Sequence, residues 1–185
     1  MNKKDFLILS IAAVAVLFMA SCSSDSGAVK FGEDATCEAG DCSNGVGTVK
    51  FAETGEFRGS FVDNNVEGPG VMVWPNGARY EGNYSNNMRN GKGTYKYSNG
   101  DVYVGDFRNN MKNGTGVYTW TDGDVYNGEW TDGKQNGQGT YKWANGVTYS
   151  GEWKEGMIDG AGTLTWPDNS KIQGTFEQNK FVSKK

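Results

Sequence analysis

The chain contains no histidine, and this absence removes much of the nucleophilic and metal chemistry that proteins use. A Ser-His-Asp triad, a Cys-His pair and a His-ligated zinc or haem are all excluded within this polypeptide. An enzyme built from it would depend on carboxylates alone. The candidate acids fall at positions of a sequence repeat, where a turn or a solvated strand face already accounts for them. We therefore expect no catalytic residues, no cofactor and no metal.

Two segments come close to ligand-binding motifs and depart from them at a decisive position. Residues 128–135 almost spell a phosphate-binding P-loop, but Gln135 stands where Ser or Thr holds magnesium, and strands rather than a helix are expected there. Residues 122–129 suggest a calcium loop, but Tyr126 occupies a ligand position and no glycine follows it. Both segments are better interpreted as turns and strand faces.

The charge pattern argues against nucleic acid as a partner. The chain has 18 basic and 22 acidic residues, a formal net charge of −4, and its longest basic runs are the pairs at 3–4 and 184–185. Binding to phosphate polymers depends on clustered cations that release counterions. The same balance disfavours electrostatic docking of the chain on anionic lipid.

A repeat of 23 residues dominates the sequence. Each copy opens with an alternating run such as Tyr126, Gly128 and Trp130, continues through a polar stretch, and alternates again in Gly-x-Gly-x-Tyr-x-Trp. Alternation with a period of two predicts strands, so each copy is a β-hairpin. Five full copies occupy 57–79, 80–102, 103–125, 126–148 and 149–171, with partial copies at 45–56 and 172–185.

Turn chemistry and side-chain alternation complete the predicted fold. The copies end in Asn-Gly or Asp-Gly, as at Asn76-Gly77, for which we predict type I′ hairpin turns; the fifth copy has Asp168-Asn169 instead. One sheet face is aromatic and glycine, so that rings lie flat over backbone, and the other is polar. The expected fold class is all-β: an antiparallel β-hairpin repeat solenoid, a single-layer twisted meander of about a dozen strands. We expect the segment at 37–42 and the tail at 181–185 to cap its two edges.

The motif Tyr-x-Gly-x-Trp/Phe followed by Gly-x-Gly-Thr, repeated every 23 residues, resembles the MORN repeat (membrane occupation and recognition nexus). The resemblance covers about three quarters of the chain and is weakest where Phe57 and Ile172 replace the first tyrosine and where Pro69 enters Gly-x-Gly. It implies a non-catalytic scaffold for protein contact or self-association, with lipid binding in some members.

Tryptophans of the aromatic face are the candidate binding residues. Rows of rings on one curved face are suited to stacking on sugars, gripping a peptide or touching acyl chains. The alternative is that the same rings are the core of the repeats, which the glycines opposite them favour. The candidates are Trp120, Trp130, Trp143, Trp153 and Trp166.

The amino-terminal segment predicts export and lipid anchoring. Basic residues at 3–4 precede an apolar run at 6–20, which is too short to span a bilayer and is typical of a signal peptide over 1–21. The ending Met19-Ala20-Ser21-Cys22 resembles the bacterial lipobox, which implies cleavage before Cys22 and acylation of that residue. Ser23 after the cysteine would, by resemblance to enteric lipoprotein sorting, favour the outer membrane over the inner.

Acylation of Cys22 leaves a pair of cysteines, and we predict a disulfide between Cys37 and Cys42. Residues 22–44 are then a lipidated cysteine, a flexible tether and an amino-terminal cap, and residues 45–185 are the repeat array. The function expected is that of a lipid-anchored interaction scaffold at the bacterial cell envelope, with an envelope protein or a second copy as partner. The alternative is an envelope glycan-binding module that uses the aromatic face.

Overall fold

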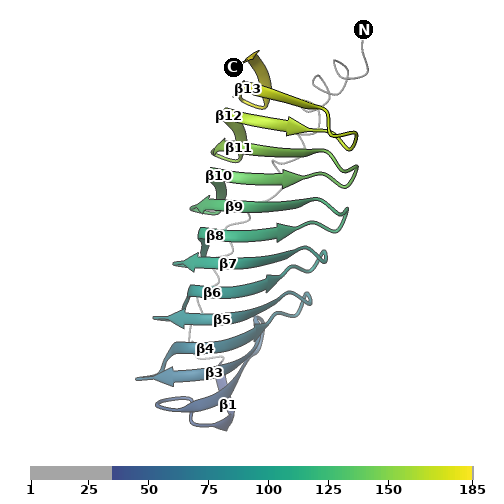
Figure 1. Ribbon diagram of the computed structural model, residues 1–185. Coiled ribbons are helices and arrows are strands. Elements are labelled where there is room, and N and C mark those ends of the chain that lie inside the picture. Colours follow the sequence, from purple (N-terminus) through teal and green to yellow (C-terminus); the bar gives the residue numbers. More distant parts are fainter. Residues whose placement is uncertain (1–34, 185) are drawn as a thin grey trace.

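The structure, a computed structural model, describes residues 35–184 and places them in one open antiparallel sheet of 14 strands that neighbour one another in chain order (Figure 1). The fold class is therefore all-β, as the repeat pattern predicted. Residues 35–184 contain no helix long and apolar enough to cross a membrane. The predicted signal peptide, Cys22 and the first part of the tether lie outside the described residues.

The strands are β1 (Ala35–Gly40), β2 (Val46–Phe51), β3 (Gly55–Val62), β4 (Asn65–Val73), β5 (Arg79–Ser85), β6 (Met88–Lys96), β7 (Val102–Arg108), β8 (Met111–Thr119), β9 (Val125–Thr131), β10 (Lys134–Lys142), β11 (Thr148–Lys154), β12 (Met157–Thr165), β13 (Lys171–Glu177) and β14 (Lys180–Lys184).

The ends of the sheet extend further than the sequence indicated. Residues 22–44 were predicted as a tether and an amino-terminal cap, with the cap at 37–42, and residues 35–40 form the edge strand β1, in which Ala35 pairs with Phe51 of β2. Ala35 also packs against the hydrophobic core, and this apolar contact stabilises the otherwise polar strand on the sheet. A disulfide joins Cys37 of β1 to Cys42 beyond it, with an S–S distance of 2.06 Å. Strands β1 and β14 are the two edges of the described sheet.

The prediction of type I′ turns at the Asn-Gly and Asp-Gly dipeptides was wrong. Five residues separate β4 from β5, too many for a two-residue hairpin loop, and of the pair only Gly77 has a positive φ, at 85°. Asn76 instead accepts a hydrogen bond from the Ala78 N–H through its side-chain oxygen at 3.0 Å. In the fifth copy Asn169 takes the left-handed position with φ 63°, so this loop keeps the same form without glycine.

Two-residue turns with positive φ at both positions occur in the polar stretches instead. Asn86 and Asn87 have φ values of 50° and 65° and connect β5 to β6. The equivalent pairs are Asp63-Asn64, Asn109-Asn110, Asp132-Gly133, Glu155-Gly156 and Gln178-Asn179. Asn, Asp and Gly tolerate this conformation best, and Glu155 and Gln178 adopt it at the equivalent repeat position with φ values of 51° and 45°.

In four of the five full copies the repeated tyrosine packs against the glycines of its own copy, and in the first copy Phe57 takes its place. Tyr103 lies along its own strand, and its hydroxyl donates to the Asp106 carbonyl oxygen at 3.0 Å. Its ring covers the cross-strand pair of Gly105 and Gly116, and a Cβ on Gly116 would lie 2.6 Å from the ring carbons. Tyr80, Tyr126 and Tyr149 repeat this arrangement and are fully buried. The expectation that glycine lets a ring lie flat over backbone is confirmed.

Candidate binding face

The face of the sheet that carries the repeated tyrosines, here called the inner face, holds a continuous row of aromatic rings. Consecutive rings lie 4.3 to 5.5 Å apart between centroids and alternate between a return strand and the residue just after it. We call this row the aromatic ladder: Trp74, Tyr95, Tyr97, Tyr118, Trp120, Tyr141 and Trp143. Rigid strands hold the rings, so the ladder is a preformed surface.

The five candidate tryptophans divide into two groups. Trp130 and Trp153 are buried, and their indole N–H groups donate to the Gly116 and Gly139 carbonyl oxygens at 3.2 Å. Trp166 is also buried, in the last full copy. These three rings occupy core positions. Trp120 and Trp143 are half-buried members of the ladder and, with Trp74, are the tryptophans that expose part of a ring to solvent.

Two buried carboxylates support the ladder from below, and sequence reasoning missed them. Asp101 accepts hydrogen bonds from the Tyr118 hydroxyl at 2.8 Å and from the Thr121 N–H at 2.9 Å. Asp124, interpreted from sequence as a turn residue, holds Tyr141 and the Ala144 N–H in the same way. Burial, with these hydrogen bonds to the carboxylates, raises the pKa of both tyrosines. The sequence feature that marks both buried carboxylates is an aspartate two residues after the Asn or Asp of the loop, as in Asn99 and Asp101.

Cations on the inner face were also missed. Arg89 and Lys112 occupy the same position in successive copies, and the other copies place Val66, Gln135, Ile158 and Phe181 there. Arg89 is only 3% exposed, and its guanidinium carbon lies 5.0 Å from the centre of the Tyr95 ring. The Lys112 ammonium lies 4.3 Å from the centre of the Trp130 ring and 4.6 Å from that of Tyr118. Cation–π attraction holds both groups over the aromatic layer.

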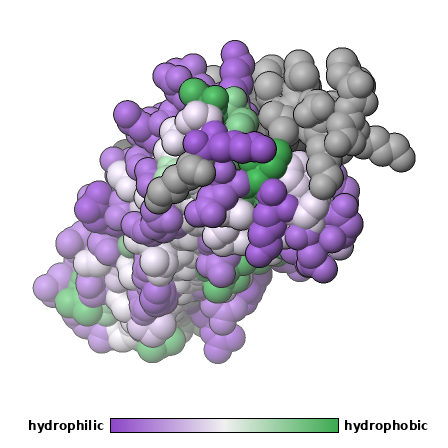
Figure 2. All heavy atoms as spheres, turned by 45° about the horizontal axis from the view of Figure 1, so that its top comes forward, coloured by the Kyte–Doolittle hydropathy of each residue, from purple (hydrophilic) through white to green (hydrophobic). Residues whose placement is uncertain are grey.

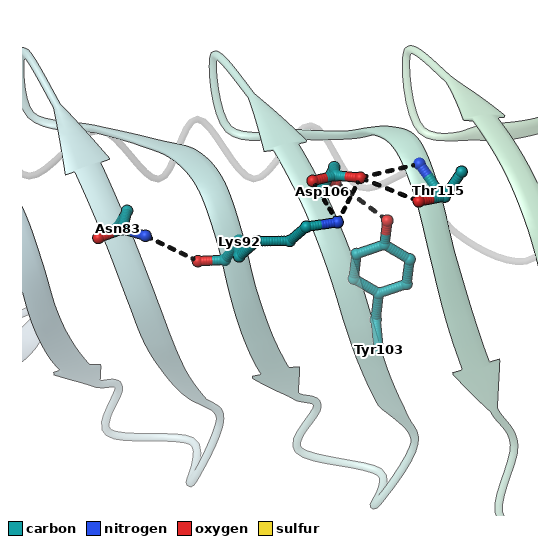
Figure 3. Close-up of polar contacts among 5 residues, drawn as sticks. All are labelled: Asn83, Lys92, Tyr103, Asp106 and Thr115. Atoms are coloured by element: carbon teal, nitrogen blue, oxygen red, sulfur yellow. Dashed lines mark hydrogen bonds and ion pairs between the residues drawn. The ribbon is translucent and has the colours of Figure 1, made fainter.

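The opposite, outer face is polar, as expected. Figure 3 shows Asp106 on β7 between two neighbouring strands, with the Lys92 ammonium 2.8 Å from one carboxylate oxygen and the Thr115 N–H 3.0 Å from the other. Partial burial alone would raise the pKa of Asp106, but the hydrogen bonds from Lys92 and Thr115 lower it. This cluster connects three neighbouring strands, and both oxygens of the Asp106 carboxylate are used in it.

The molecular surface carries no large apolar patch in the view of Figure 2, where hydrophilic residues dominate and hydrophobic ones are scattered. The segment that resembles a P-loop divides between β9, the turn at Asp132-Gly133 and β10, as expected for strands. Within residues 35–184, no three Cys, Asp or Glu side chains gather closely enough to hold a metal ion.

The architecture defines a class, a single-layer repeat protein built from β-hairpins that each pack mainly against their neighbours. Five segments match the family model of the MORN repeat: 57–79, 80–102, 103–125, 126–148 and 149–171. These segments are the five full copies found in the sequence and make up more than half of the chain. The chain therefore belongs to the MORN repeat family.

Two further comparisons add little to this assignment. No curated protein matches the chain by sequence. Among solved structures, the chain is similar to the TCP domain of SAS-4 (dCPAP) of Drosophila melanogaster in complex with a proline-rich motif of Ana2 (dSTIL). That similarity has 14% sequence identity and a TM-score of 0.35, and it covers 71% of this chain and 84% of the other.

Proposed function

We propose that the protein is a non-catalytic, lipid-anchored scaffold of the bacterial cell envelope that binds a protein partner through its inner face. The observation that carries the proposal is the aromatic ladder, a preformed row on a rigid MORN-repeat sheet in which half-buried rings alternate with buried tyrosines. Aromatic rings supply large contact area at low entropic cost, and tryptophan and tyrosine dominate the energetics of protein interfaces.

Anchoring is the second part of the proposal and rests on the sequence. Acylation of Cys22 would hold the array next to a membrane, and several acyl chains give stable attachment where one does not. In this proposal the residues between Cys22 and Ala35 would serve as a tether that lets the array reach a partner away from the bilayer surface. Replacing Cys22 with serine should release the protein from the membrane fraction and abolish metabolic labelling with palmitate; a membrane-bound, unlabelled variant would overturn this part.

The partner is best sought by crosslinking in cells, with a photoreactive residue at the ladder position Trp120. A matched probe at Lys142, which is exposed in β10 and lies outside the ladder, reports crosslinks made by proximity alone. A distinct protein recovered from position 120 and not from 142 is the expected result. Wall fragments recovered in place of protein would favour the glycan-binding alternative, and recovery of the same chain only would mean self-assembly.

A further inference from the structure

Two buried polar groups on the inner face have donors without an acceptor among the described residues. The Arg89 Nε–H and the Tyr84 hydroxyl are both buried and both lack a hydrogen-bond partner. The two residues are directly opposite each other in the β5–β6 pair, so the unused donors share one place on the sheet. The guanidinium makes one hydrogen bond, from Nη2 to the Asn110 carbonyl oxygen at 3.1 Å, and no described carboxylate pairs with it.

The repeat fold does not require these groups. At the Arg89 position, Val66 and Ile158 are 0% and 2% exposed and complete the core without a charge. At the Tyr84 position, the neighbouring copies carry Phe61 and Phe107, which are equally buried and have no hydroxyl group. Burying a guanidinium without a carboxylate is costly, and cation–π contacts offset only part of that cost. A function in binding explains why the pair departs from the apolar pattern.

The unused donors define the chemistry of the ligand. A guanidinium and a phenol hydroxyl, both able to donate, suit an anionic oxygen acceptor, and carboxylate fits the fork of arginine well. The guanidinium lies beneath Trp74, whose half-buried ring is centred 5.9 Å from it. Four rings surround the guanidinium carbon within 5.9 Å, and Trp74 is the one among them that is not buried, so the approach for a ligand is on the Trp74 side.

Lys112, the second cation on the inner face, indicates which backbone conformation the ligand has. Arg89 on β6 and Lys112 on β8 are two strand spacings apart, about 9.6 Å along the array. In a polyproline II helix, side chains three residues apart point the same way and lie about 9.3 Å apart. In an extended β-strand, same-side residues are about 7 or 13 Å apart, and neither distance matches.

We propose that Arg89, Tyr84 and Lys112 bind two carboxylates, three residues apart, in a partner segment that adopts polyproline II conformation along the aromatic ladder. This inference rests on the proposed function, because it names the chemistry of the protein partner at the same face. The aromatic ladder would contact the apolar rings of proline, as aromatic-lined grooves do in other recognition modules.

The test uses the full-length lipidated protein in detergent micelles and labelled twelve-residue proline-rich peptides, measured by fluorescence anisotropy. One peptide carries two glutamates three positions apart, a second carries glutamines in their place, and others space the glutamates by two or four. We expect the first peptide to bind about tenfold or more tightly than the glutamine peptide, the size expected for hydrogen bonds to charged groups. Arg89→Val should abolish that difference, and Tyr84→Phe should reduce it.

Several controls keep the test decisive. Lys142→Gln removes one exposed charge outside the proposed site and should leave the discrimination intact. Arg89→Val should fold normally because Val66 fills the same position, and a thermal unfolding midpoint no lower than that of the wild type verifies this. Wild-type protein that treats glutamate and glutamine peptides alike, or an Arg89→Val variant that still discriminates, would overturn the proposal.

Two other outcomes separate this inference from the proposed function. Binding to vesicles containing phosphatidylglycerol, lost in Arg89→Val, with no preference among the peptides, would assign the cations to a lipid surface and contradict the inference. Recovery of a protein through position 120 by crosslinking would still support the scaffold. If crosslinking recovers no protein but the purified chain still prefers the glutamate peptide, the scaffold function in cells is contradicted and the carboxylate site is supported.

Discussion

At the scale of the residue, the contact between the repeated tyrosine and its glycines sets the tightest constraint on the sequence. Gly116 has an ordinary backbone conformation, so alanine is allowed there except for its Cβ, which would lie 2.6 Å from the Tyr103 ring. We expect Gly116→Ala to lower the free energy of unfolding by about 2 kcal/mol through overpacking. Urea denaturation followed by tryptophan fluorescence measures this.

The matched control is Gly77→Ala, where a Cβ meets nothing within 4 Å and only the positive φ of 85° opposes alanine. That substitution should cost about 1 kcal/mol. In a Tyr103→Ala background, Gly116→Ala should cost much less than in the wild type, because the ring that it meets is gone. Equal costs in the two backgrounds would show that the ring contact is not the cause.

The buried tyrosines also make stability depend on pH. Burial raises the pKa of Tyr80 from an ordinary value near 10 to about 12, and it raises the pKa of Tyr103, Tyr126 and Tyr149 as well. The folded state therefore keeps protons that the unfolded chain releases. Their contribution to stability is complete below pH 10 and is lost as the pH rises through the folded-state values.

Urea midpoints measured from roughly pH 8 to pH 11 should therefore stay level and then fall above about pH 10. Tyr80→Phe should fall less steeply, because one ionisation is removed, while replacing an exposed lysine such as Lys142 with Gln should leave the slope unchanged. A midpoint that stays level through pH 11, or an unchanged slope in Tyr80→Phe, would contradict the linkage.

At the scale of the element, the two-residue turns connect neighbouring hairpins. The Asn110 N–H donates to the Arg89 carbonyl oxygen at 3.0 Å, and the Asn110 side chain accepts from the Arg89 N–H at 2.8 Å. Asn87 and Asn179 make the same two bonds to the preceding copy. Gly133 makes only the backbone bond, to the Lys112 carbonyl oxygen at 2.9 Å.

Replacing Gly133 with asparagine should therefore stabilise the protein. The new side chain can accept from the Lys112 N–H, and asparagine tolerates the φ of 88° at that position. We expect a gain of about 1 kcal/mol, the net value of one hydrogen bond. Gly133→Ala, which offers no acceptor, is the control and should destabilise; a thermal midpoint of Gly133→Asn at or below the wild-type value would show that the bond does not form.

The elements also show where sequence reasoning succeeds and where it stops. Alternation found the strands because a sheet with one aromatic face imposes a period of two on every copy. Turn type was not predictable from dipeptides, because Asn76-Gly77 and Asn86-Asn87 both suit left-handed backbone and only the number of loop residues distinguishes them. The paired donors at Tyr84 and Arg89 were hidden, because their meeting depends on register across the β5–β6 turn.

At the scale of the whole molecule, the described strands hydrogen-bond only to their neighbours in chain order, and ring contacts reach no further than the next repeat, so the array should tolerate the loss of a complete repeat. Deleting residues 103–125 joins Val102 to Tyr126 and restores the same motif and the same strand direction. We expect a folded sheet of two fewer strands, with lower stability because one repeat interface is lost. Far-ultraviolet circular dichroism and urea denaturation measure both effects.

The control for that deletion removes one strand and its turn, residues 102–110, so that β8 would follow β6 directly. The loop at 97–101 then places β8 beside β6 in the position of β7, so two return strands of the repeat become neighbours. That junction loses Tyr103, whose ring covers the cross-strand glycine pair in the intact repeat. This shorter deletion should abolish cooperative unfolding, although it removes fewer residues. Loss of folding in the longer deletion, with survival of the shorter, would show that the array depends on specific copies and not on the repeat period.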